Sequence, residues 1–184
     1  MFVLSTAFLF VTSFLLFSLS PCVLLAQDGP TQACPHIEGE YRCENIDEDP
    51  GNYEYLSISQ VMEGGVMTYK ISVDEPDPLI FKADGVERES FKVDDLDPDQ
   101  KTYSRSTNLA SCKDGRLYLS LSEQLSLSKD MSEELLYMKA DEMLTPNESG
   151  FVVDYDSYLR YKDLFTGEVL QEREVGAERC ERLK

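Results

Sequence analysis

The stretch Cys34-Pro35-His36-Ile37-Glu38-Gly39-Glu40-Tyr41-Arg42-Cys43 decides how this chain folds. It has the pattern of the first strand of a β-sheet protein, and it carries two of the four cysteines that follow an apolar leader. If residues 36–42 are extended, a rise of about 3.3 Å per residue places the two cysteines roughly 30 Å apart, too far to bridge. We therefore expect this strand to be tied to distant parts of the chain.

The leader is residues 1–26, which carry no charged side chain and are mostly Phe, Leu, Val and Ser. This composition predicts a secretory signal peptide cleaved after Ala26, where a small residue precedes a polar segment. The long apolar run and the absence of Lys or Arg at its start leave a retained anchor as the alternative. We expect residues 27–33 to be an N-terminal tail and residues 34–184 to be one disulfide-linked β domain.

Four cysteines remain after the leader, an even number that predicts two disulfides in an exported chain. Two pairings stay open: Cys34–Cys112 with Cys43–Cys180, or Cys34–Cys180 with Cys43–Cys112. A metal centre is not expected, because no Cys-x-x-Cys pair exists and the chain has one histidine. No cofactor is predicted. The expected location is secreted or periplasmic, with no membrane span once the leader is removed.

Three pairs of alternating segments flank turn-forming glycines, and each pair predicts a β-hairpin. The pairs are residues 53–62 with 66–73, 79–83 with 86–93, and 102–112 with 116–122. The middle pair is joined by Asp84-Gly85, which suits a tight turn because both positions tolerate positive φ. Residues 94–101 are expected to form an acidic loop, and residues 151–162 the longest alternating strand.

Residues 132–144 fit either a helix or a strand. Ser132 can cap a helix and Glu133 and Glu134 suit its first turn, yet the same residues can be extended. Few helical signals occur elsewhere. The sequence therefore predicts an all-β, mainly antiparallel meander that closes into a barrel or folds into a sandwich, with one short helix near 132–144 left open.

The net charge of −18 limits the partners of this domain. Such a charge repels nucleic acid, whose phosphates need Lys and Arg, and it repels anionic membrane surfaces. We expect no nucleic-acid partner.

Gly39-x-Tyr41 on the first strand resembles the Gly-x-Trp motif of the lipocalins, with Tyr in place of Trp, and Asp154-Tyr155 resembles the Thr-Asp-Tyr motif later in that family. Lipocalins are eight-stranded barrels that hold small apolar molecules. The resemblance implies that Gly39, Tyr41, Asp154 and Tyr155 are structural residues at the base of a barrel. It also implies a pocket lined by inward-facing apolar side chains.

Asp95-x-Asp97-x-Asp99 has the carboxylate spacing that begins an EF-hand calcium loop. Gln100 then stands where glycine is needed, so at most a loose calcium site is predicted, formed by Asp94, Asp95, Asp97 and Asp99. Catalytic residues are not expected. The single histidine, His36, lies beside a cysteine, and no pair stands out among the many carboxylates.

The leading functional prediction is an exported, non-enzymatic binding or interaction protein of the cell envelope or extracellular space, with an unknown protein or envelope surface as partner. Exposed tyrosines would supply its contact face; the candidates are Tyr53, Tyr55, Tyr69 and Tyr118. The alternative is a lipocalin-like carrier of a small apolar molecule, which needs an apolar cavity. The second alternative is a carboxylate-dependent hydrolase, which needs two carboxylates facing each other in a cleft.

Overall fold

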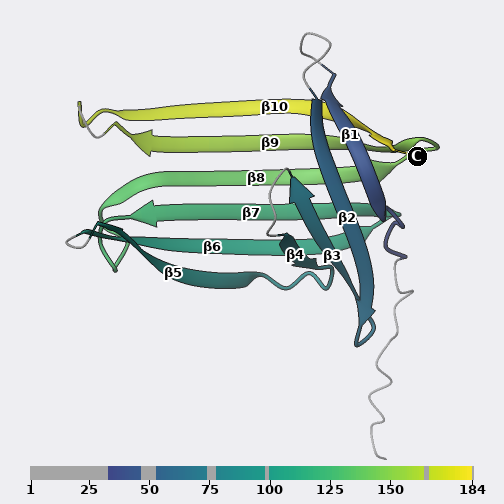
Figure 1. Cartoon of the computed structure of the whole chain (residues 1–184), viewed down its shortest axis with the longest axis horizontal. Coiled ribbons are helices and arrows are strands. Elements are labelled where there is room, and N and C mark those ends of the chain that lie inside the picture. The colour runs from purple at the N-terminus through teal and green to yellow at the C-terminus, as the bar shows by residue number, and fades with distance from the viewer. Residues whose placement is uncertain (1–32, 47–52, 74–77, 98–99, 164–165, 184) are drawn as a thin grey trace, which may run out of the picture. The chain divides into compact units, whose positions relative to one another are not determined.

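The computed structural model describes residues 33–46, 53–73, 78–97, 100–163 and 166–183, so the predicted leader lies outside the described residues. Ten strands form one antiparallel sheet, and this part of the chain contains no helix and hence none that could span a membrane (Figure 1). The strands are β1 Gly39–Asn45, β2 Tyr53–Glu63, β3 Val66–Val73, β4 Leu79–Lys82, β5 Arg88–Asp97, β6 Gln100–Lys113, β7 Arg116–Ser126, β8 Glu134–Pro146, β9 Gly150–Lys162 and β10 Val169–Arg182.

The sheet is a meander whose first and last strands lie side by side. Its strand order is β4-β3-β2-β1-β10-β9-β8-β7-β6-β5, so every consecutive pair is hydrogen-bonded except β4 and β5. Figure 1 shows β1–β3 crossing β6–β10 at a steep angle, and β4 at one edge contacts β6 near the other. The sheet is therefore a strongly curled half-barrel, which confirms the predicted all-β antiparallel class.

The core lies where the two parts of the curled sheet face each other. Alternation sends one side chain in two into this space, and both parts contribute large apolar groups. Tyr41 of β1 packs edge-on against Phe151 of β9, with ring centroids 4.7 Å apart. The buried apolar residues of this cluster are Ile37, Tyr41, Cys43, Ile58, Tyr69, Ile71, Phe81, Ala110, Leu117, Leu119, Leu144, Phe151, Val153 and Cys180.

Two disulfides tie β1 and the segment just before it to distant parts of the chain, as the spacing of Cys34 and Cys43 predicted, although the strand begins only at Gly39. Of the two open pairings the structure has Cys34–Cys112 with Cys43–Cys180. Cys43 and Cys180 are directly opposite in the β1–β10 ladder, so this bond holds the meander's two ends together. Both disulfides indicate an oxidising compartment.

The predicted hairpin at Asp84-Gly85 is wrong. β4 pairs with β3 and β5 pairs with β6, so these two strands lie at opposite edges of the sheet. Gly85 does have positive φ (71°), but its N–H donates to the carbonyl of Ala110 at 2.8 Å, in a link that crosses between the edges. The local sequence determines the backbone conformation at Gly85, whereas the packing of Phe81 in the core determines that β4 pairs with β3.

The acidic loop expected at 94–101 is also wrong, because β5 continues to Asp97 and β6 begins at Gln100. The open choice at 132–144 is a strand: β8 is paired on both sides, with β7 and with β9. The other two hairpins are confirmed. They turn at Gly64-Gly65 and at Asp114-Gly115, all four residues having positive φ.

Candidate functional site

A pocket of about 440 Å³ lies beside the core, between the two parts of the curled sheet. Its inner wall is the buried core, including Phe81, Leu119 and Val153, and its rim includes the exposed residues Glu54 and Val73. The lining residues come from every strand except β5 and β6: Cys43, Asn45, Glu54, Leu56, Ile71, Val73, Leu79, Phe81, Leu119, Leu121, Ala140, Glu142, Leu144, Val153, Tyr155, Ser157, Glu174, Glu178 and Cys180.

Most of the wall is apolar, because the inward positions of the strands carry branched aliphatic side chains. Leu56, Ile71, Val73, Leu79 and Phe81 form the side contributed by β2–β4. The facing side, from β7–β9, is formed by Leu119, Leu121, Ala140, Leu144 and Val153. Contact between such a surface and water costs free energy, so the pocket favours an apolar ligand.

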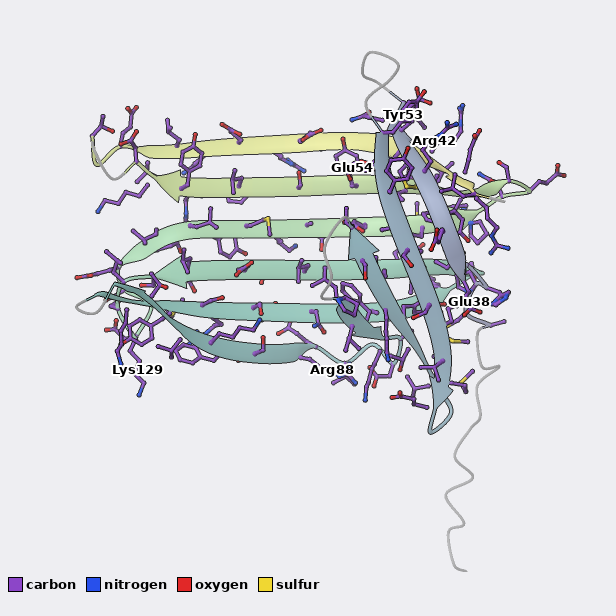
Figure 2. All side chains as sticks on the ribbon, in the orientation of Figure 1. Glu38, Arg42, Tyr53, Glu54, Arg88 and Lys129 are labelled. Carbon is purple, nitrogen blue, oxygen red and sulfur yellow. A yellow bond between two sulfur atoms is a disulfide. The ribbon has the colours of Figure 1, made fainter. Side chains whose placement is uncertain are left out.

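Four glutamates line the pocket, of which Glu54 and Glu174 are exposed, and none of the lining residues is Lys, Arg or His. Glu54 lies near the start of β2 (Figure 2), Glu142 lies on β8, and Glu174 and Glu178 lie on β10. Strand pairing brings Glu54 and Glu178 close together. Cys43 of β1 lies opposite Glu54 on one side and opposite Cys180 on the other, and Glu178 is two residues before Cys180. The pocket therefore combines an apolar surface with a concentration of negative charge.

Tyr155 is held at a fixed place in the pocket. Its hydroxyl donates to Glu174 Oε1 at 2.7 Å and accepts from Asn45 Nδ2 at 3.1 Å. The hydrogen bond to Glu174 raises the pKa of Tyr155 to about 12. The ring lies over Gly176 of β10, where an added Cβ would meet the hydroxyl oxygen at 2.6 Å. A glycine at this position is thus required for the observed ring position.

Glu142 differs from the other acids of the pocket because it is desolvated and, among the residues that the structure describes, has no hydrogen-bonding or charged partner. It stands between Leu119 of β7 and Tyr155 of β9 in the ladder. Burial raises the pKa of its carboxyl. A partly buried carboxylate without a partner is costly, and such groups concentrate at functional sites. A second carboxylate hydrogen-bonded to it, as a carboxylate dyad would show, is not found among the described residues.

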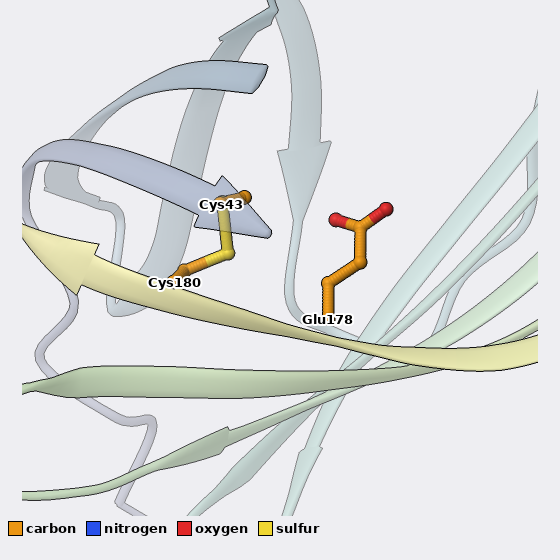
Figure 3. Close-up of side chains that lie close together, drawn as sticks. All are labelled: Cys43, Glu178 and Cys180. Atoms are coloured by element: carbon orange, nitrogen blue, oxygen red, sulfur yellow. A yellow bond between two sulfur atoms is a disulfide. The ribbon is translucent and has the colours of Figure 1, made fainter. Parts of the chain in front are cut away.

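Glu178 approaches the Cys43–Cys180 disulfide, as Figure 3 shows. The two Sγ atoms and a carboxylate oxygen of Glu178 all lie within 4.8 Å of one another, a spacing that could suit a metal ion. Both sulfurs are bonded to each other, so neither is a thiolate that could bind a metal ion. This cluster is a disulfide with a neighbouring carboxylate.

The four motif residues do not come together in one place. Gly39 and Tyr41 lie on β1, where Arg182 of β10 covers the Tyr41 ring and donates to its hydroxyl at 3.0 Å. A Cβ at Gly39 would meet the Arg182 guanidinium at 3.1 Å, so the glycine allows this packing. Tyr155 lines the pocket, whereas Asp154 points from the other face of β9 and is exposed.

Three of the four predicted calcium residues lie at the end of β5. The backbones of Asp94, Asp95 and Asp97 are in β5, their side chains are not described, and Asp99 lies outside the described residues. The loose calcium site therefore stays a prediction.

The candidate tyrosines do not form one face. Tyr53 and Tyr55 are exposed on the outer side of β2, Tyr118 is half-buried on the outer side of β7, and Tyr69 is in the core.

Comparison with protein-family models, curated proteins and solved structures finds no match to this chain.

The pocket glutamates were missed at the sequence level because they are dispersed among 35 acidic residues. One signal could have found Glu142. It lies on the same inward face of β8 as Leu136, Met138, Ala140 and Leu144. A charged residue at a position where the alternation of a strand predicts an apolar one indicates a polar group in a pocket or core.

Proposed function

We propose that this protein is an exported binding protein that holds a small molecule in the pocket between the two parts of its sheet. The observation that carries the proposal is the pocket itself, about 440 Å³ with walls that are mostly apolar and a few convergent polar groups. Small-molecule sites have this size and this composition. The two disulfides support a role outside the reducing cytosol.

Binding of the neutral, environment-sensitive dye Nile red tests this proposal. The wild-type protein is expected to bind the dye with increased fluorescence. Ala140→Trp, which fills the pocket from β8, is expected to weaken binding by at least about tenfold. Lys139→Trp is the matched control, because the neighbouring side chain projects from the opposite face of β8. Equal binding by the two variants, or a wild type that binds neither this dye nor any charged apolar probe, would contradict the proposal.

Native mass spectrometry of the protein purified from its own exported fraction, without reduction, complements the dye. An additional mass that leaves on gentle activation is the expected result for a carried molecule. The same spectrum tests the predicted cleavage after Ala26, since the mature chain would begin at Gln27.

One observation favours a second candidate, a protein-interaction module that uses the edge of the sheet. β5 is an edge strand, and its outer face carries Phe91 and Val93, exposed by 43% and 49%. Edge strands with exposed apolar side chains can accept a further strand from another chain. Phe91→Lys with Val93→Lys would abolish such an interaction while leaving Nile red binding unchanged.

A further inference from the structure

We propose that the pocket selects small organic cations, an ammonium group carried on an apolar body, over neutral and anionic molecules of the same shape. This inference rests on the proposed binding function and specifies the chemical class of its ligand. Three observations support it: the charge of the pocket, the unpartnered carboxyl inside it, and the shape of its apolar surface.

The first observation is charge. Glu54, Glu142, Glu174 and Glu178 line the pocket, and no basic side chain among the described residues lines it. Low-dielectric walls strengthen and focus the field of such a group of like charges. The field attracts a cation and repels an anion, so charge complementarity identifies the occupant as positive.

The second observation is Glu142. Two half-buried acids elsewhere in this sheet have partners within the chain: Glu134 forms an ion pair with Arg160 at 2.7 Å, and Glu123 accepts from Ser104 at 3.0 Å. Glu142 is similarly placed on the same strand as Glu134, yet it contacts no hydrogen-bond donor or cation of the described chain. A ligand ammonium would supply the missing partner. Because a neutral ligand would further desolvate this carboxylate without pairing it, the site disfavours neutral molecules.

The third observation is the apolar surface on either side of Glu142. Leu121 and Ala140 lie beside it on the pocket wall, and Phe81 lies on the strands of the other part. The inward face of the sheet then continues past the pocket with half-buried apolar pairs, Met138 opposite Leu159 and Leu136 opposite Tyr161. A bare metal ion or a wholly polar polyamine would leave this surface in contact with water, so the cation is expected to carry an apolar chain.

Isothermal titration calorimetry with octyltrimethylammonium, octanol and octanoate tests the inference, since the three probes share one apolar chain and differ in charge. The cation is expected to bind at least about tenfold more tightly than the alcohol, and the anion more weakly than either. Glu142→Gln is expected to lower the affinity for the cation about tenfold and to leave the affinity for octanol unchanged or higher. This variant should fold, because it removes a desolvated charge.

The matched control is Glu148→Gln in the β8–β9 turn, an exposed position that is not part of the pocket. It removes the same unit of charge from a chain of net charge −18, so it separates a local effect from general attraction of cations. If both variants lose affinity equally, or if octanol binds as tightly as the cation, the inference is overturned while the pocket function stands. If none of the three probes nor Nile red binds, the proposed function itself fails.

Discussion

Replacement of Gly176 by alanine tests the link between the backbone of β10 and the position of Tyr155. An added Cβ would lie 2.6 Å from the Tyr155 hydroxyl oxygen and 2.8 Å from Cζ, well inside contact distance. The ring must therefore move, and its hydrogen bonds to Glu174 and Asn45 are lost or lengthened. Overpacking of this kind costs about 1–3 kcal/mol. Because the site is only half-buried, and alanine restricts the unfolded chain, we expect about 1 kcal/mol net.

The measurement is urea denaturation of four proteins: wild type, Gly176→Ala, Tyr155→Ala and the double variant. Gly176→Ala should lower the free energy of unfolding in the wild-type background. In the Tyr155→Ala background, where the ring is absent, the same change should be neutral or stabilising. The coupling between the two sites would then be about 1 kcal/mol or more. An equal cost in both backgrounds would refute the reasoning, since it would show that the glycine acts through something other than the ring.

Two further predictions follow from the tyrosines and the disulfides. The pKa of Tyr69, raised by burial, and that of Tyr155, raised by Glu174, both lie at about 12, above the ordinary 10.0. The folded state thus holds both protons more tightly, so unfolding free energy should fall as pH rises from about 10 towards 12; in denaturation across this range, Tyr155→Phe should show a shallower fall. Joint replacement of Cys43 and Cys180 by alanine should cost about 2–5 kcal/mol, and a loss under about 1 kcal/mol in urea denaturation would contradict the proposed closure role.

Several features of the fold were predictable because local chemistry specifies them. The β2–β3 hairpin follows from alternating strands around Gly64-Gly65, where two adjacent residues must adopt positive φ. The exclusion of a Cys34–Cys43 bond follows from the length of an extended segment. Neither inference requires knowledge of which strands meet across the sheet.

The site was much less predictable than the fold class. Glu54, Glu142 and Glu178 come from three different strands, and long-range strand pairing together with the curling of the sheet brings them to one pocket. Similarly, Asp84-Gly85 has the composition of a hairpin turn, yet its flanking strands lie at opposite edges. Turn residues encode a backbone conformation; they do not encode the strand that each flanking segment will pair with.

The sequence by itself determined an antiparallel β domain, its two disulfides and its acidic character, because alternation, cysteine parity and charge are properties of the chain at short range. Tertiary structure alone decided the Cys34–Cys112 and Cys43–Cys180 pairing, the strand at Glu134–Pro146 and the pocket. The Cys43–Cys180 bond and the pocket depend on β1 lying against β10, a contact between the two ends of the domain, whereas the strand depends on its pairing with β7 and β9. Such long-range pairing is settled by the packing of the whole core, which no single segment specifies.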